Sequence, residues 1–406
     1  MDAEARILHV VPRIVLRGAE VFAAQLAEAL QPVSRNLLFP LFGPEEGRPA
    51  AAVRVVPGAR PRQRVERLTG VDPGALARMR LGLRRLRPDL VVAHGSEPLK
   101  YLSFADPRSR VPVVYRRISH AVGGPGEAVL RRLFGRASLI LAVSGGLRDE
   151  LVRDLGVDPG LITVLPTSRK PPPSPTPEAR ASLRAEIGGD PDRPLVVWVG
   201  RMSPEKQPGV ALQAFALLRS RFGPCTFAMC GDGPLREAVS YAAESAGDGV
   251  RVLGSREDAG AIIAAADLLV SSSRIEGAPG VLVEAGLAGT PVVAFDVGEV
   301  ASIVRHGETG LLVTPGDAEA LAEAARRLLE RPELRSRMSA AAPTVCAQFA
   351  LESIAGRYAE AFGELLGPEG DGLRRMASAT APPEPGRPAA DEDPREMTHP
   401  PFPPDT

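Results

Sequence analysis

Short runs of Val, Leu, Ile and Ala recur along the chain, separated by longer stretches with apolar residues at helical spacing. Such unbroken apolar runs are typical of strands that a parallel sheet buries on both faces. Alternation of strands with helices predicts an α/β protein with two Rossmann-like domains. The clearest runs are residues 7–11, 90–93, 111–115, 139–143 and 162–165, then 195–199, 227–230, 250–254, 267–270, 292–295 and 310–313.

A proline-rich break separates the two sets of strands. Residues 166–177 contain six prolines and no strand or helix period, which indicates a linker. The expected organisation is a first domain at 1–168, a linker at 169–192 and a second domain at 193–350. An amphipathic helix is expected at 351–366, and the polar, Pro-rich residues 367–406 are expected to be a disordered tail.

The stretch 270–293 is the most informative part of the second domain. A strand ends in serines, a turn carries Glu276, and a helix is expected to open at Pro279, where proline fits the first turn. Free amides at a helix start attract anions, and Glu276 and Glu284 flank that start at roughly 8–10 Å from each other. The sequence therefore predicts a cleft for a ligand with hydroxyls at both ends. Its expected binding residues are Gly277, Ala278, Pro279, Gly280, Val281 and Glu284.

A second candidate follows the apolar run 195–199. The loop Gly200-Arg201-Met202-Ser203-Pro204-Glu205-Lys206 brings an Arg and a Lys to the carboxyl edge of the expected sheet. Arg201 offers a planar fork to a phosphate and Lys206 a point charge, so together they can hold a diphosphate. Lys206 is one of only three lysines in the chain.

The string Glu-Gly-x-Pro-Gly-x-x-x-Glu-Ala-x-x-x-Gly-x-Pro-Val-Val, from Glu276, resembles that of the retaining glycosyltransferases of family 4. The Gly-Arg-…-Glu-Lys loop also matches this family. The resemblance covers most of residues 6–366 and implies the GT-B fold, with the 351–366 helix packed on the first domain. It implies that Glu276 faces the donor sugar, Glu284 the ribose of a nucleotide sugar, and Ser255 and Arg256 the base.

The resemblance also implies site residues in the first domain. Gly18 stands in the family's Gly-Gly-Ala-Glu turn, near the donor phosphates or the acceptor, although Arg17 replaces the first glycine. The family often has a catalytic His, near the reacting sugar, after the strand expected at 111–115. Here His120 lies a couple of residues beyond the usual place, and His94 is a weaker candidate. His9 is expected in the core or at its rim.

The amino-acid composition limits which binding partners and which cellular location are expected. The 49 basic and 49 acidic residues cancel, which argues against a general nucleic-acid binder. Three scattered cysteines indicate neither disulfides nor zinc, and the polar N-terminus lacks a signal peptide, so a cytoplasmic location is expected. Residues 54–87 are rich in Arg. This stretch is either a solvated face or a peripheral contact with anionic lipid at the inner face of the plasma membrane.

The expected activity is transfer of a hexosyl unit from a UDP- or GDP-sugar to a hydroxyl of a glycan, glycolipid or small molecule. The acceptor and the choice of nucleotide stay open. No Asp-x-Asp follows a strand, because Asp190-Pro191-Asp192 and Asp391-Glu392-Asp393 lie in a loop and in the tail. Neither a metal nor another cofactor is therefore expected. The alternatives are a sugar-nucleotide epimerase and a catalytically silent nucleotide-sugar-binding protein or partner subunit.

Overall fold

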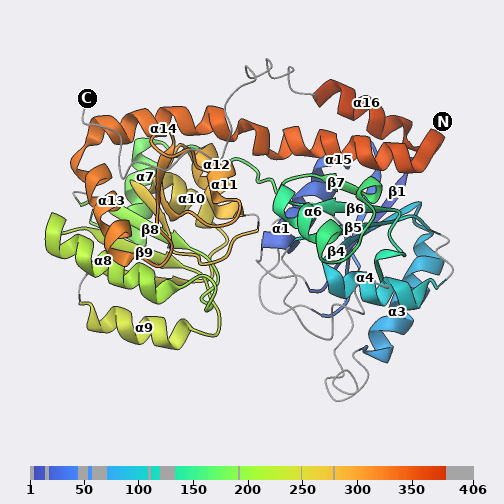
Figure 1. The fold of residues 1–406 in the computed structure, drawn as a ribbon, viewed down its shortest axis with the longest axis horizontal. Coiled ribbons are helices and arrows are strands. Elements are labelled where there is room, and N and C mark those ends of the chain that lie inside the picture. The colour runs from blue at the N-terminus through green and yellow to red at the C-terminus, as the bar shows by residue number, and fades with distance from the viewer. Residues whose placement is uncertain are drawn as a thin grey trace. The chain divides into compact units, whose positions relative to one another are not determined.

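The structure is a computed structural model that describes residues 4–13, 18–43, 54–56, 71–107, 111–118, 133–190, 193–247, 249–277 and 279–380. Its contacts divide the chain into two compact units (Figure 1). The first unit comprises Met1–Pro171, Glu276–Gly280 and Phe349–Thr380. The second comprises Pro172–Ile275 and Val281–Gln348.

Parallel strands form a seven-stranded sheet in the first unit, in the order β3-β2-β1-β4-β5-β6-β7. Side chains alternate between its two faces, so Leu8 and Val10 join one core cluster while Ile7 joins another. The strands are β1 (Arg6–Val11), β2 (Arg35–Pro40), β3 (Arg54–Val55), β4 (Leu90–His94), β5 (Val113–Arg117), β6 (Leu139–Ala142) and β7 (Ile162–Val164).

Helices cover both faces of this sheet. Asp72 caps one of them by accepting a 2.7 Å hydrogen bond from the amide of Ala75, and Ser144 caps another through the amide of Leu147. The helices from the first part of the chain are α1 (Gly18–Ala29), α3 (Pro73–Leu86), α4 (Ser96–Ala105), α6 (Gly145–Arg153) and the short η1 (Pro159–Leu161).

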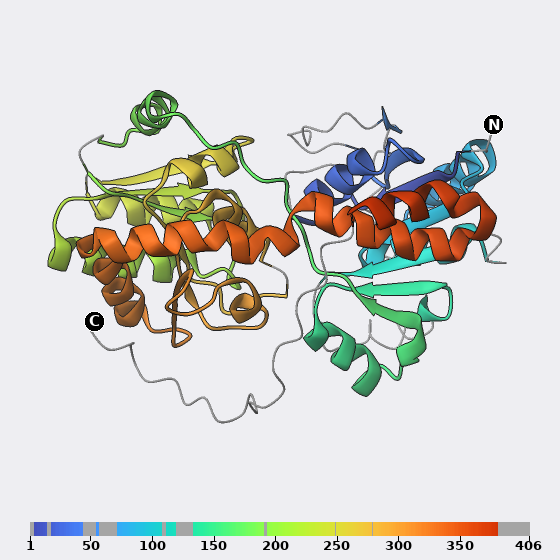
Figure 2. The same ribbon diagram turned by 90° about the horizontal axis from the view of Figure 1, so that it is seen from above.

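The last described residues complete the first unit. Helix α15 (Leu351–Leu366) buries Tyr358 and Phe362 against the same sheet face as α1, where Phe22 lies. Each such aromatic contributes about 1.5–3 kcal/mol of burial energy. Residues from 367, expected to be disordered, instead form η3 (Gly367–Gly370) and α16 (Asp371–Thr380). Helix α16 lies beside α15 because Leu373 is buried in the same cluster (Figure 2).

The second unit has a six-stranded parallel sheet in the order β10-β9-β8-β11-β12-β13. Its strands are β8 (Leu195–Val199), β9 (Thr226–Cys230), β10 (Val250–Gly254), β11 (Leu268–Ser271), β12 (Val292–Phe295) and β13 (Gly310–Val313). These strands match the apolar runs of the sequence. Two parallel-sheet Rossmann-like domains are thus confirmed as the fold class.

One helix of the second unit, α7 (Pro177–Glu186), lies inside the expected linker. Thr176 caps this helix by accepting a hydrogen bond from the amide of Ala179. The prediction of a linker over 169–192 was therefore wrong for residues 177–186. The helices are α7 (Pro177–Glu186), α8 (Pro208–Phe222), α9 (Arg236–Ser245), α10 (Ala259–Ala265), α11 (Gly280–Ala288), α12 (Val300–Ile303), α13 (Ala318–Glu330), α14 (Pro332–Cys346) and η2 (Ala347–Phe349), with α11 and η2 extending across the division between units.

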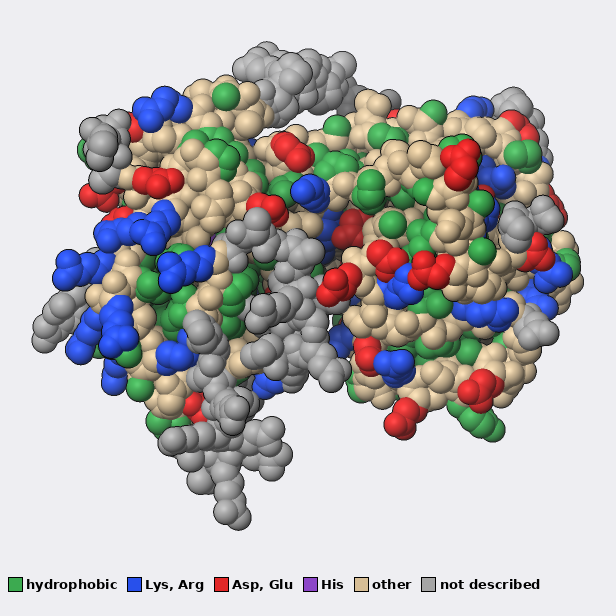
Figure 3. Space-filling model, turned by 180° about the vertical axis from the view of Figure 1, so that it is seen from behind, with side chains coloured by type: hydrophobic (Ala, Val, Ile, Leu, Met, Phe, Trp, Pro, Cys, Tyr) green, Lys and Arg blue, Asp and Glu red, His purple; other side chains and the backbone are tan. Residues whose placement is uncertain are grey.

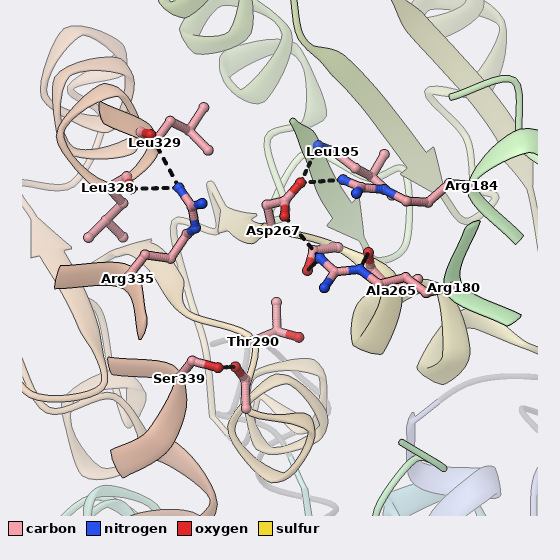
Figure 4. A network of polar contacts seen from close by, with 12 residues as sticks. Arg180, Arg184, Leu195, Ala265, Asp267, Thr290, Leu328, Leu329, Arg335 and Ser339 are labelled. Atoms are coloured by element: carbon pink, nitrogen blue, oxygen red, sulfur yellow. Dashed lines mark hydrogen bonds and ion pairs between the residues drawn. The ribbon is translucent and has the colours of Figure 1, made fainter. Parts of the chain in front are cut away.

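Asp267 explains why α7 docks on this unit (Figure 4). Its carboxylate accepts from Arg180 Nη2 at 2.9 Å, from Arg184 Nη2, and from the amide of Leu195 at 2.8 Å. Arg180 Nε also donates to the carbonyl oxygen of Ala265 at 2.9 Å. One carboxylate therefore joins α7 to the starts of β8 and β11. None of the helices in the described ranges is both long and apolar enough to cross a membrane.

Candidate functional site

Each sheet contains one point at which the strand order reverses, and in the second sheet this switch point lies between β8 and β11. The two strands pair directly, Val196 with Leu268 and Val197 with Leu269. Ligands of open α/β sheets bind in the crevice beyond the carboxyl ends of such strands. The loop 200–207 after β8, which holds two of the residues singled out from the sequence, therefore begins at the expected binding position.

Ser272, just after β11, connects the two loops of the switch point. Its hydroxyl lies 3.0 Å from the carbonyl oxygen of Lys206 and 2.9 Å from that of Gln207, and it accepts from Trp198 Nε1 at 3.2 Å. The amide of Arg274 donates to the carbonyl oxygen of Glu205 at 2.9 Å. These bonds fix the backbone that carries the Lys206 side chain.

Gln207 adopts a backbone conformation that is costly for any residue except glycine. Its φ of 47° and ψ of 54° place it in the left-handed region immediately before α8. Such a residue costs about 1–2 kcal/mol, and strain of this kind gathers at functional sites. The turn redirects the chain straight after Lys206, so the strain is located at the end of the cation-bearing loop.

The charges of this loop act on one another. Ser203 is the main cause that lowers the pKa of the Glu205 carboxyl, and the positive charges of Arg201 and Lys206 lower it further. Arg201 is exposed and Lys206 is half-buried. The loop therefore carries two cations, which can bind a phosphate group, beside an ionised carboxylate that offsets part of their charge.

Two glycines after β9 allow the neighbouring loop to approach this one closely. A Cβ atom on Gly231 would lie 1.8 Å from the carbonyl oxygen of Gly200, and one on Gly233 would lie 2.5 Å from that of Met202. The amides of Gly200 and Met202 donate to the carbonyl oxygens of Cys230 and Asp232 at 3.0 and 2.9 Å. The turn is therefore a structural support for the loop that contains Arg201.

The two carboxylates predicted as site residues, Glu276 and Glu284, belong to different units. Glu284 is half-buried on α11, within the second unit, whereas Glu276 is buried and belongs by its contacts to the first unit, as do Gly277, Pro279 and Gly280. Helix α11 begins at Gly280, one residue after the expected start. Val281 is the first residue of this helix in the second unit. Ala278 and His120 lie outside the described residues.

Arg256, expected to face a nucleotide base, is held by two acids of its own unit. Its Nε and Nη2 atoms donate to the Asp258 carboxylate at 2.7 and 2.6 Å, and Nη2 also donates to Glu186 at 2.8 Å. The fork of this guanidinium is therefore engaged on one side by protein carboxylates. Ser255 beside it is exposed.

In the first unit, Gly18 begins α1 and lies next to a buried arginine that the sequence analysis overlooked. A Cβ atom on Gly18 would lie 2.9 Å from Arg169 Nη2. Arg169 is 6% exposed, and its Nη1 atom donates to the carbonyl oxygen of Ser168 at 2.8 Å. The only sequence signal for this residue was an arginine within a proline-rich segment.

Two buried histidines lie across the switch point of the first sheet, between β1 and β4. His9 Nδ1 is 3.2 Å from His94 Nε2, and His9 Nε2 is 3.0 Å from Asn36 Oδ1. The expected core position of His9 agrees with its complete burial. Burial lowers the pKa of His9 to about 4, and burial, followed by the charges of His9 and Arg116, lowers that of His94 well below its ordinary value.

Comparisons with known proteins identify the family of this chain. Residues 179–345 match the family model described as glycosyl transferases group 1, and residues 16–168 match the one described as glycosyltransferase family 4. The chain is 33% identical over 284 residues to the alpha-D-kanosaminyltransferase of Streptomyces kanamyceticus, covering 67% of this chain and 70% of that protein.

Two further similarities extend the comparison. The D-inositol 3-phosphate glycosyltransferase of Rhodococcus jostii is 33% identical over 303 residues, covering 71% of this chain but 63% of that protein. Among solved structures, Anabaena HepE in complex with UDP-glucose superposes with a TM-score of 0.73 at 22% identity. That superposition covers 88% of this chain and 99% of HepE, and it supports the fold alone.

Proposed function

Because the chain belongs to the group 1 glycosyltransferases of family 4, we propose that it moves a hexosyl unit from a nucleoside-diphosphate sugar to an acceptor hydroxyl. The observation that carries the proposal is the switch point of the second sheet. There the loop with Arg201 and Lys206 is fixed by Ser272 at the position where α/β sheets bind ligands.

In the proposed reaction the bond from the anomeric carbon to the diphosphate oxygen breaks, and the acceptor oxygen bonds to the same carbon with retention of configuration. The proton of the acceptor hydroxyl passes to the departing diphosphate. Arg201 and Lys206 stabilise the negative charge that grows on this leaving group. Glu284 accepts hydrogen bonds from the ribose hydroxyls, and Glu276 from hydroxyls of the transferred sugar.

The proposed donor is a UDP-sugar, for which UDP-glucose, the ligand present in the HepE structure, is the probe, and a GDP-sugar is the competing donor. The proposed acceptor is a hydroxylated ring of the cyclitol type. Two relatives are named for such acceptors: the inositol phosphate enzyme, and the 2-deoxystreptamine N-acetyl-D-glucosaminyltransferase of Streptomyces fradiae, 29% identical over 348 residues.

The test is transfer from radiolabelled UDP- and GDP-sugars to myo-inositol, D-inositol 3-phosphate and 2-deoxystreptamine. Lys206→Ala should lower kcat by about 10²–10³-fold, the usual effect of removing one group that stabilises transition-state charge. Glu276→Ala should also lower kcat, because it removes the acceptor that orients the hydroxyls of the transferred sugar. Arg337→Ala is a matched control, because that arginine is exposed on α14. Full activity in both site variants would refute the assigned roles.

Metal independence is a separate part of the proposal. In this scheme Arg201 and Lys206 balance the diphosphate charge that a divalent ion balances in other transferases. We expect the rate to be unchanged after dialysis against EDTA. A rate that falls with EDTA and returns with Mg²⁺ or Mn²⁺ would overturn this part and leave the transfer reaction standing.

The competing function is a catalytically silent nucleotide-sugar-binding protein. Calorimetry with UDP-glucose, UDP and GDP separates the two, because an enzyme both binds and turns over its donor. Binding with neither transfer nor slow hydrolysis of the donor would favour the silent protein.

We also propose that α3 contacts an anionic membrane surface. Arg80, Arg84 and Arg85 are exposed on this helix, which contains no acidic residue, and Leu81 is 46% exposed beside them. Lys and Arg side chains gather around an apolar area on the face of the first unit seen from behind (Figure 3). Each such cation contributes about 1 kcal/mol near an anionic bilayer. Co-sedimentation with phosphatidylglycerol vesicles but not with phosphatidylcholine vesicles is the expected result.

A further inference from the structure

His94, one of a pair of buried histidines in the first unit, lies at the carboxyl end of its strand, where ligands of parallel sheets bind, whereas His9 lies within β1. His9 is on β1 and His94 is the last residue of β4, and these two strands flank the point where the strand order reverses. Both side chains are at most 1% exposed. Their rings are stacked, with centroids 5.4 Å apart. Buried polar atoms normally have hydrogen-bond partners. Assigning these partners shows which nitrogen atoms of the pair have none.

The hydrogen bonds fix which nitrogen of each ring carries the proton. The Asn36 amide nitrogen donates to the carbonyl oxygen of Ser34 at 2.9 Å, so its Oδ1 atom must face His9 Nε2, which carries hydrogen. Because burial keeps both rings neutral, His9 Nδ1 is an acceptor and His94 Nε2 donates to it. His94 Nδ1 is then a lone-pair acceptor, and it has no hydrogen-bond partner.

The neighbouring strand supplies an unused donor. Arg116 on β5 is the register partner of His94 and is 1% exposed. Its Nε atom donates to the Tyr358 hydroxyl at 3.0 Å and its Nη2 atom to Thr167 Oγ1 at 2.8 Å, while the guanidinium lies 4.0 Å from the centroid of the Phe22 ring. Its Nη1 atom has no partner. None of the described residues provides a carboxylate for this buried charge, although a buried cation is expensive without one.

An unused acceptor and an unused donor on adjacent strands match the chemistry of a hydroxyl group, which donates once and accepts as well. We propose that His94 Nδ1 and Arg116 Nη1 bind a hydroxyl of the acceptor substrate, a neutral or anionic polyhydroxylated ring. This inference rests on the proposed function and narrows its acceptor class. An ammonium group at this place would meet the uncompensated charge of Arg116, so an aminocyclitol amine is disfavoured there.

Kinetics separate this role from a structural one. His94→Phe keeps a ring and removes the acceptor nitrogen, so the KM for myo-inositol or D-inositol 3-phosphate should rise about 10-fold or more. The KM for UDP-glucose should stay the same. Tyr358→Phe is the matched control, because it removes a partner of Arg116 but leaves Nη1 unchanged, and the acceptor KM should stay within about 2-fold. Equal acceptor KM values in wild type and His94→Phe would overturn the proposal.

A spectroscopic readout decides the proposal without turnover. In the full chain labelled with ¹⁵N-histidine, the His94→Phe variant identifies the resonances of His94, and its Nδ1 should be unprotonated in the free protein. Titration with myo-inositol should shift that resonance. A protonated Nδ1, or a resonance that saturating myo-inositol leaves unchanged because only a trapped water is present, refutes the site. Absence of UDP-glucose transfer and hydrolysis in wild type would instead refute the proposed function, which the titration does not measure.

Discussion

We expect acidification from pH 8 to pH 5 to destabilise the first unit, because its buried histidine pair stays neutral while folded. The pKa of His9 is lowered from 6.5 to about 4, chiefly by burial. An unfolded chain takes up a proton near pH 6.5, whereas the folded unit does not until about pH 4. The unfolded state therefore binds more protons in this window, and stability is complete above pH 6.5 and falls as the pH drops towards 4.

The two pKa values of His9 set the size of the effect. Linkage between 6.5 unfolded and about 4 folded gives a loss of about 2 kcal/mol at pH 5 from this residue alone. The pKa of His94 is lowered in the same direction, so the pair loses more than this. A domain is stabilised by only about 5–15 kcal/mol in total. The shift is therefore large enough to measure.

The assay is urea unfolding at both pH values, followed by far-UV circular dichroism and by fluorescence. Trp198 is the only tryptophan of the chain and is buried in the second unit, which lacks the histidine pair. Its fluorescence therefore follows the unfolding of the second unit, which serves as an internal control. The unfolding of the first unit is followed by circular dichroism. In the double variant His9→Gln, His94→Gln, the free energy of this unfolding should depend less on pH. If the wild type and the double variant lost the same free energy of unfolding at pH 5, the reasoning would be wrong.

Three further predictions concern the second unit, and all are read from Trp198 fluorescence during urea unfolding. Gln207→Gly should raise the free energy of unfolding by about 1 kcal/mol, because glycine adopts φ of 47° without strain; a lowered midpoint would contradict this. Asp267→Ala should cost about 3 kcal/mol or more by leaving its partners unpaired, whereas Asp154→Ala, which breaks an exposed pair in the other unit, should leave this transition unchanged. Gly231→Ala should cost more than about 2 kcal/mol, because its Cβ would overlap a backbone oxygen, while Gly209→Ala, with open space around it, should be neutral or slightly stabilising.

The local part of this structure could be predicted from the sequence. The unbroken apolar runs became strands because parallel sheets bury both faces, and the loop with Arg201 and Lys206 follows its strand as expected. Short-range patterns specify such features. The separate roles of Glu276, which is expected to bind the donor sugar, and Glu284, which is expected to bind the ribose, stay a prediction that rests on the family resemblance.

Features that depend on distant contacts could not be predicted. The His9–His94 bond joins residues 85 positions apart and depends on strand order, which periodicity does not reveal. The Glu186 partner of Arg256 is 70 positions away. Helix α16 was overlooked because Leu373 is one of few apolar residues in a short polar segment, and only its burial beside α15 makes it fold.

The first unit is assembled from both ends of the described chain, and this has a consequence for biosynthesis. Tyr358 and Phe362 fill the core under β1 and β4, so the ribosome must translate the whole second unit before that core can close. Until then the nascent chain exposes the apolar surface that Tyr358 and Phe362 later cover, which is the kind of surface that chaperones bind. The unit that is translated first is therefore the one that matures last.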